Sequence, residues 1–251
     1  MNIIANASIS LVIQGSILNE EISGTADDDV IYAGPGDDLV RAQAGNDIII
    51  GGPGMDRLNG GVGNDVVDGG SGPDRLWGEE GDDAIRGGEG DDWLFGGPGD
   101  DRLDGGDGND LLDPGAGNNV VRAGAGDDTI GVEYHELFFD ESGSTILLAG
   151  EGNDLSWGGT LDDNMRGEAG NDVLYGGHGN DRLDGGEGDD DLSGSDGFDR
   201  LLGADGDDVL RAGEGGGILT GGSGRTALTS FSILRPYSRT IQRTPGSKRM
   251  S

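Results

Sequence analysis

The sequence predicts an all-β fold in which short parallel strands stack as a solenoid, with two strands in each coil of eighteen residues. A nine-residue repeat, a high glycine content and an excess of acidic residues predict it. The segment from Gly51 to Asp74 shows the repeat clearly, as GGPGMDRLN, GGVGNDVVD and the start of a third copy, GGSGPD. Glycine occupies positions 1, 2 and 4, aspartate position 6 and an aliphatic residue position 8.

Each repeat combines a tight loop with a short strand. The glycines allow the positive φ angles that a tight loop needs. In the strand, the residue at position 8 points to one face and its neighbours at positions 7 and 9 point to the other. One repeat cannot bury its aliphatic residue alone, so two repeats form a coil with one strand on each wall. Stacking then places each loop about 4.8 Å from the loop one coil earlier.

Stacking also places the aspartates of position 6 in rows. Carboxylates at this spacing repel one another, and only a cation can neutralise them. Carboxylate and carbonyl oxygens suit Ca²⁺, which takes six to eight oxygen ligands at about 2.3–2.6 Å. The chain has no cysteine and only His135 and His178, which excludes zinc or copper cages over most of its length. The sequence therefore predicts calcium ions between stacked loops.

The composition makes calcium a condition of folding. The chain has 49 acidic against 16 basic residues, and 55 of its 251 residues are glycine, a balance that ordinarily predicts disorder. We therefore expect largely unfolded repeats without metal and folded repeats with it. The net charge of −33 argues against nucleic acid as a partner. No apolar run approaches the roughly 20 residues of a membrane span.

Residues 1–23 precede the first regular repeat. They contain no lysine or arginine, whereas a secretory signal peptide begins with a basic region. Ile13 and Ile22 continue the spacing of position 8 into this segment. We therefore interpret residues 1–23 as an N-terminal cap over the first coil rather than as a signal peptide.

Block one covers residues 24–131 and contains twelve repeats, each with an aliphatic residue at position 8. Its residues at position 6 form ten pairs separated by eighteen positions, and only the pair of Asp101 and Asn119 lacks a second carboxylate. Block one therefore predicts nine complete calcium sites. The predicted ligands are Asp29, Asp38, Asp47, Asp56, Asp65, Asp74, Asp83, Asp92, Asp101, Asp110 and Asp128.

Residues 132–148 interrupt the repeat. An eight-residue insertion from Val132 to Phe139 is followed by a decayed repeat with Leu147 at position 8. The insertion contains HELFF, which begins like the zinc-protease motif HExxH, but Phe139 stands in place of the second histidine. We expect no zinc site here, and interpret the insertion as a bulged loop or a joint between two rolls.

Block two covers residues 149–229 and contains nine repeats, of which the last two are degenerate. Gly217 and Thr226 replace the last two aspartates of position 6, which leaves five complete pairs. Together with block one, the sequence predicts about fourteen calcium ions. The predicted ligands in block two are Asp154, Asp163, Asp172, Asp181, Asp190, Asp199 and Asp208.

Two further features lie outside the calcium rows. Trp77 and Phe95 at position 9, with Trp93 at position 7, form an aromatic cluster that could bind a glycan or protein partner. Packing along the sheet or against a terminal segment is the alternative. Residues 230–251 form a tail with five bases and no acid. We expect the tail to be disordered; the alternatives are a segment that folds back on the acidic repeats, one that binds an anionic surface, or the product of a disrupted reading frame.

The two blocks resemble the RTX, or haemolysin-type, calcium-binding repeats of serralysin-type proteases, secreted lipases, alginate epimerases and pore-forming toxins. The resemblance implies a right-handed parallel β-roll and a ligand set for each ion. Around one ion, the carbonyls of Gly52 and Gly54 with the Asp56 carboxylate would face the carbonyls of Gly69 and Ser71 with the Asp74 carboxylate. It also implies secretion by a type I system of a Gram-negative bacterium, although the tail is more basic than the family's usual secretion signals.

No G-x-S-x-G, H-E-x-x-H or P-loop motif is present, and we expect no enzymatic activity. The favoured hypothesis is an extracellular calcium-binding protein that folds on calcium and acts as a scaffold, adhesin or matrix component. The alternative is the β-roll portion of a secreted protease, lipase, epimerase or toxin whose catalytic domain is encoded outside this chain. Ice binding is a third hypothesis, but Arg57, Arg75 and Trp93 interrupt the regular file of Thr or Asn that it needs.

Overall fold

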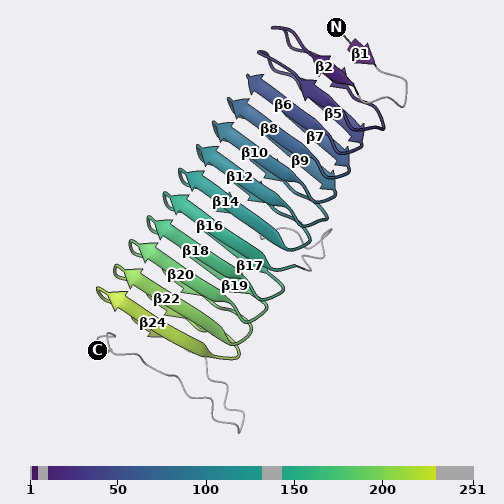
Figure 1. Ribbon diagram of the computed structural model, residues 1–251. Helices are drawn as coiled ribbons and strands as arrows, with labels where there is room; N and C mark the ends of the chain where they lie inside the picture. The colour runs from purple at the N-terminus through teal and green to yellow at the C-terminus, as the bar shows by residue number, and fades with distance from the viewer. Residues whose placement is uncertain (1, 5–10, 132–142, 230–251) are drawn as a thin grey trace. The chain divides into compact units, whose positions relative to one another are not determined.

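The computed structural model describes residues 2–4, 11–131 and 143–229. All regular secondary structure in these residues is β-strand, numbered β1 to β25, and Figure 1 labels many of these strands. None of the described residues forms a helix long and apolar enough to cross a membrane. The chain divides into two compact units, unit 1 (residues 1–125) and unit 2 (residues 126–251). The predicted insertion at Val132–Phe139 and the tail at 230–251 lie outside the described residues.

Unit 1 consists of two parallel sheets that alternate along the chain. Odd-numbered strands form the order β1-β3-β5-β7-β9-β11-β13, and even-numbered strands form β2-β4-β6-β8-β10-β12-β14. The strands are β1 Asn2–Ile4, β2 Val12–Gln14, β3 Glu21–Ser23, β4 Val30–Tyr32, β5 Leu39–Ala44, β6 Ile48–Pro53, β7 Arg57–Val62, β8 Val66–Ser71, β9 Arg75–Glu80, β10 Ala84–Glu89, β11 Trp93–Phe95, β12 Arg102–Asp107, β13 Leu111–Asp113 and β14 Asn119–Ala125.

Unit 2 repeats this arrangement. Its odd strands follow the order β15-β17-β19-β21-β23-β25 and its even strands β16-β18-β20-β22-β24. The strands are β15 Thr129–Ile130, β16 Thr145–Glu151, β17 Leu155–Gly159, β18 Asn164–Ala169, β19 Val173–Gly177, β20 Arg182–Glu187, β21 Asp191–Ser193, β22 Asp199–Asp205, β23 Val209–Arg211, β24 Gly217–Ser223 and β25 Ala227–Thr229.

The strand register confirms the predicted solenoid with two strands per eighteen-residue coil. In β6 and β8, Ile49 lies opposite Val67, and β8 and β10 place Val67 opposite Ile85. The spacing is larger where β15 pairs with β17, because Ile130 lies opposite Ser156, twenty-six positions later. The extra eight positions equal the length of the insertion expected from the sequence, so the coil lengthens without losing register.

The core is a file of position-8 side chains between the two sheets of each unit. Leu58, Leu76 and Leu94 are fully buried, and each contributes about 1.5–3 kcal/mol relative to an exposed side chain. Ser156 occupies the same position in β17 and is also fully buried, next to Ile130 and Leu174 in the register. Its hydroxyl has no hydrogen-bond partner, so the core of unit 2 is weaker at this point.

The segment interpreted as an N-terminal cap continues the repeat from residue 11 onward. Strand β2 pairs with β4 and strand β3 pairs with β5 in the regular register. Ile13 and Ile22 are buried like the other residues of position 8. Residues 11–23 therefore stack in the register of the repeats, with loops whose sequences differ from the glycine-rich pattern.

Candidate metal centre

The loops between strands bring the position-6 carboxylates into rows along both edges of each unit. Asp56, Asp74 and Asp92 are almost completely buried. The main-chain N–H of Asp56 donates to Oδ1 of Asp74 at 2.8 Å, and the N–H of Asp74 donates to Oδ1 of Asp92 at 2.8 Å. The same contact recurs in unit 2, where the N–H of Asp172 donates to Oδ1 of Asp190 at 2.9 Å. One oxygen of each carboxylate thus faces the preceding coil.

The other oxygen of these carboxylates is buried without a hydrogen-bond partner. A buried charged oxygen in this state costs several kcal/mol, and so many in one fold indicate that a cation completes the arrangement. The oxygens concerned are Oδ2 of Asp38, Asp47, Asp56, Asp65, Asp74, Asp83, Asp92, Asp101, Asp154, Asp172, Asp181, Asp190, Asp199 and Asp208. The remaining predicted ligands Asp110, Asp128 and Asp163 are equally buried.

Main-chain carbonyls converge on the same places. A Cβ atom built on Gly69 would lie 2.5 Å from Oδ2 of Asp74 and 2.8 Å from the carbonyl oxygen of Gly87, in the following coil. Both oxygens therefore border one small space beside the loop. A Cβ atom at position 1 would enter this space, and glycine occupies the position in most loops.

The ligand set implied by the family resemblance lies between two successive loops. Oδ2 of Asp56 and the carbonyl of Gly69 both border Gly51. The carbonyls of Gly52 and Gly54 point at Gly70 and Gly72 of the following loop. The carbonyl of Ser71 faces back and accepts a hydrogen bond from Gly54 N at 2.8 Å. These oxygens are hard ligands of the type that Ca²⁺ binds, and they would supply its coordination shell.

The donor set also limits which metal fits. Among the described residues, no group of three or more His, Cys, Asp or Glu side chains could hold a metal ion. An ion between the loops would therefore take most of its ligands from main-chain carbonyls. Such a site suits the variable oxygen coordination of Ca²⁺ better than the strict octahedron of Mg²⁺.

Burial raises the pKa values of the carboxyl groups in the rows. Loss of hydration is the largest cause, and repulsion from neighbouring carboxylates adds to it, while the N–H donor of the preceding coil acts in the opposite direction. The pKa rises to about 7 for Asp74, for Asp92 and for Asp181. Protons and calcium therefore compete for the same oxygens near neutral pH.

This competition predicts opposite pH dependences for the metal-free and the calcium-bound protein. Raised pKa values stabilise the metal-free fold below the unfolded value of about 3.8, and this stability is lost as the pH rises through about 7. In calcium-free buffer, the β signal in circular dichroism should thus be stronger at pH 5 than at pH 8. Calcium affinity should change the other way and weaken from pH 8 to pH 5.5, with protons released on binding at pH 7. A pH-independent calcium affinity over this range would contradict the assignment.

A second row, at position 5, was not predicted. The N–H of Asp82 donates to Oδ1 of Asn64 at 3.0 Å, and the N–H of Asp100 donates to Oδ1 of Asp82 at 2.9 Å. This row runs in the opposite direction to the position-6 row and is exposed. A matching position-5 row contains Asp37 and Asp91. It is interrupted between Met55 and Pro73, because Met55 has no side-chain acceptor and Pro73, eighteen residues later, has no N–H to donate. The signal was present in the sequence, because Asp or Asn fills position 5 in most repeats.

The structure also pairs two predicted ligands that the repeat count had separated. The N–H of Asp128 donates to Oδ1 of Asp154 at 2.8 Å, although these residues are twenty-six positions apart. Asp29 differs from the other predicted ligands, because Leu11 N donates to its Oδ1 at 2.6 Å and Thr25 N to its Oδ2 at 2.6 Å.

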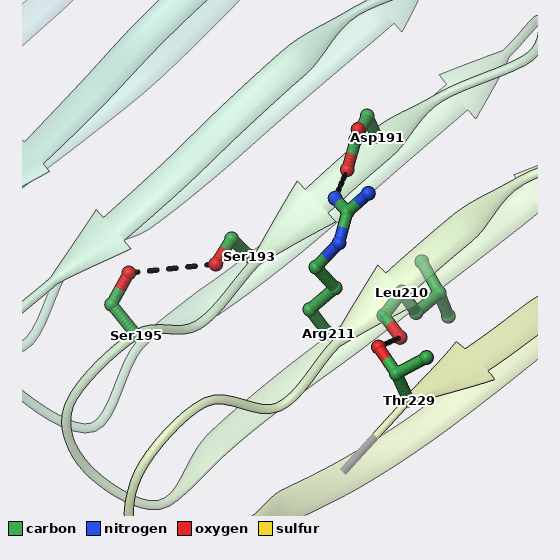
Figure 2. Close-up of polar contacts among 6 residues, drawn as sticks. All are labelled: Asp191, Ser193, Ser195, Leu210, Arg211 and Thr229. Carbon is green, nitrogen blue, oxygen red and sulfur yellow. Dashed lines mark hydrogen bonds and ion pairs between the residues drawn. The ribbon is translucent and has the colours of Figure 1, made fainter. Parts of the chain in front are cut away.

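Position 2 of the loop carries backbone strain at five residues that are not glycine, namely Gln43, Glu79, Glu168, Ser195 and Ala204. Glu79 has a φ of 76° and Ser195, in the loop after β21 (Figure 2), has a φ of 67°. A side chain in this left-handed region costs about 1–2 kcal/mol. Glu79→Gly should therefore raise the stability of the calcium-bound protein by about 1 kcal/mol in denaturant unfolding. Glu80→Gly, at the next position, is the control and should give no gain; equal effects of the two changes would show that the strain is not real.

The aromatic cluster is already engaged within the protein. Trp77 and Phe95 stack with their rings 5.7 Å apart and 8° from parallel. The guanidinium of Arg75 lies 4.4 Å from the centre of the Trp93 ring. In unit 2, Trp157 and Tyr175 form a similar stack at 5.8 Å. These contacts show aromatic packing along the sheet, and binding of a glycan or protein partner at this cluster stays a prediction.

Comparison with protein families agrees with this geometry. A model of the RTX calcium-binding nonapeptide repeat matches residues 14–49, 41–76, 50–85, 77–112, 115–131, 157–192, 184–219 and 193–226. These segments together cover well over half of the chain. A comparison with curated proteins found no match. The chain therefore belongs to the family of proteins with RTX calcium-binding nonapeptide repeats, and calcium is the metal of its loop rows.

Proposed function

We propose that the protein is a secreted, non-enzymatic calcium-binding β-roll that folds outside the cell and acts as a scaffold, adhesin or matrix component. One observation carries the proposal: long rows of buried aspartate oxygens lack a hydrogen-bond partner among the described residues and converge with main-chain carbonyls. Such rows oppose folding without a cation and favour it with one. Extracellular calcium modules bind at about 10⁻⁴–10⁻³ M, so folding of this kind is suited to the outside of the cell.

The distribution of charge supports a role in surface contacts. Nearly all arginines of the described residues lie at positions 7 and 9, on the outer faces of the sheets, whereas the acidic residues concentrate in the loops. Figure 2 shows one of them, Arg211, paired with Asp191 on the adjacent strand. The outer face of β2 to β8 also exposes a row of apolar side chains that includes Val12, Ile48 and Val66. The walls are therefore the surfaces on which a partner could pack without repulsion.

The number of bound ions tests the proposal. The structure adds the pair of Asp128 and Asp154 to the predicted pairs, and it gives Asp29 donors for both of its oxygens. We therefore still expect about fourteen ions per chain. Metal analysis after equilibrium dialysis should return this number at saturation. A value of only a few ions would show that successive coils do not form sites in pairs.

The second candidate function is that of the β-roll portion of a secreted enzyme, and the neighbouring genes distinguish it from the first. In that case a catalytic domain should be encoded in the neighbouring reading frame. Its purified product should then bind this chain in the presence of calcium and release it in chelator.

A further inference from the structure

We propose that three loops are closed by hydrogen bonds of the protein itself in place of calcium, namely the loops that end at Glu20, Asp29 and Asn119. This inference rests on the proposed calcium-dependent folding, and it names the loops that take no ion of their own. The inference concerns position-6 residues that differ from the calcium ligands in one respect: the side-chain oxygen or nitrogen that would face the ion has a hydrogen-bond partner within the protein.

The first two loops satisfy their carboxylates from position 2. The N–H of Ser16 donates to Oε2 of Glu20 at 2.7 Å, and its hydroxyl donates to Oε1 at 3.0 Å. The N–H of Thr25 donates to Oδ2 of Asp29 at 2.6 Å, and its hydroxyl donates to the same oxygen at 3.0 Å. In both loops, hydrogen-bond donors occupy the side of the carboxylate that a cation would need.

The position of the acceptor oxygen is the same as in the calcium loops. A Cβ atom built on Gly15 would lie 2.6 Å from Oε2 of Glu20, and one built on Gly24 would lie 2.7 Å from Oδ2 of Asp29. The corresponding distance is 2.5 Å from Gly69 to Oδ2 of Asp74. The three oxygens therefore stand in equivalent places, and only their surroundings differ.

The backbone at position 2 explains the difference. Gly70 has a φ of 109° and Glu79 a φ of 76°, and the carboxylates of their loops keep Oδ2 without a partner. Ser16 and Thr25 are outside the left-handed region, which a β-branched residue such as threonine strongly disfavours. In a left-handed position 2 the N–H points to the following coil, as Gly34 N does to the carbonyl of Gly51 at 2.8 Å. At Ser16 and Thr25 the N–H points instead to the carboxylate of its own loop.

Asn119 closes its loop in a different way. Its Oδ1 keeps the contact of the row and accepts from Asp101 N at 2.8 Å. Its amide nitrogen takes the place of Oδ2 and donates to the carbonyls of Gly115 at 3.1 Å and Pro114 at 3.4 Å. A positively polarised N–H₂ group thus binds carbonyls that would otherwise be offered to an ion.

These loops lie at the ends of the calcium rows of unit 1. The row of Asp47, Asp65, Asp83 and Asp101 lies between Asp29 and Asn119, so it starts and ends on a loop that needs no metal. The row that contains Asp74 starts after Glu20, whose N–H donates to Oδ1 of Asp38 at 2.7 Å. The loops that end at Glu20 and Asp29 can therefore present ordered first members to both rows before any ion binds.

The experiment converts these loops into calcium loops and counts ions by metal analysis. The double change Thr25→Gly and Asp27→Gly gives the loop the sequence GGAGDD, which matches the repeat pattern, and should add about one ion per chain. Asn119→Asp restores a second carboxylate opposite Asp101 and should also add about one ion. Asn64→Asp is the matched control, because it makes the same chemical change at exposed position 5 and should add none.

The outcomes separate this inference from the proposed function. One outcome would overturn the inference alone. In that outcome the wild-type chain binds about fourteen ions, and neither the Thr25→Gly/Asp27→Gly variant nor the Asn119→Asp variant binds an additional ion. An additional ion in the Asn64→Asp control equal to that in Asn119→Asp would overturn it as well, since added charge would then explain the gain. A wild-type chain with only a few ions would instead contradict the calcium-dependent roll. Circular dichroism in saturating calcium verifies that each variant is folded.

Discussion

In chelator at neutral pH, the far-UV circular dichroism spectrum of the full chain should be that of a disordered chain, and calcium should convert it cooperatively to β-structure. The physical reason is the set of buried carboxylates, whose oxygens carry charge without partners when no cation is present. The net charge of −33 adds a general repulsion that opposes the compact state. The hydrophobic contribution to folding in the absence of metal comes from a narrow file of aliphatic residues.

Magnesium is the control in this titration. Mg²⁺ neutralises charge equally well but demands a small octahedral site and gives up water reluctantly, so it should induce folding poorly at the same concentration. Equal effects of the two ions would reduce the role of calcium to charge screening. A full β spectrum in excess chelator at pH 8 would contradict calcium-coupled folding altogether.

The fold could be predicted from the sequence because the repeat encodes it locally. Glycine at positions 2 and 4 fixes the loop, and an aliphatic residue at position 8 fixes which face of the strand is buried, as at Leu58 and Leu76. The repeat length then sets the register between coils. Even the interruption after residue 131 obeys this rule, since Leu147 returns to the core.

The details of individual loops could not be predicted from the pattern, because they depend on backbone direction. The sequence placed Asp29 with the other ligands, but whether its carboxylate meets an ion or the N–H of Thr25 is decided by the φ angle of position 2. The contact of Asp128 with Asp154 depends on how the chain passes through an insertion. The hydrogen bonds of the position-5 row depend on the direction of each main-chain N–H. The sequence identifies the Asp and Asn acceptors but not the direction of the N–H groups that donate to them.

Loss of a central carboxylate should damage the roll far more than loss of a terminal one. In unit 1, Asp74 is the middle member of the row that runs from Asp38 to Asp110, and it contacts Asp56 on one side and Asp92 on the other. Asp74→Ala should therefore weaken two calcium sites. It also leaves the buried N–H of Asp56 without its acceptor, at a cost of about 1–3 kcal/mol. We expect the calcium midpoint of folding to rise about tenfold or more, in proportion to that loss.

Asp208 is the matched control at the end of a row. Its Oδ1 accepts a weaker bond from Asp190 N at 3.3 Å, and Thr226 replaces the carboxylate of the following coil. Asp208→Ala should remove one site, leave unit 1 folded and shift the midpoint only slightly, because a stacked array loses least cooperativity at its end. Calcium titrations of the two variants by circular dichroism make the comparison. Equal shifts would mean that each loop binds its ion independently of its neighbours, which the shared carboxylates of the rows do not allow.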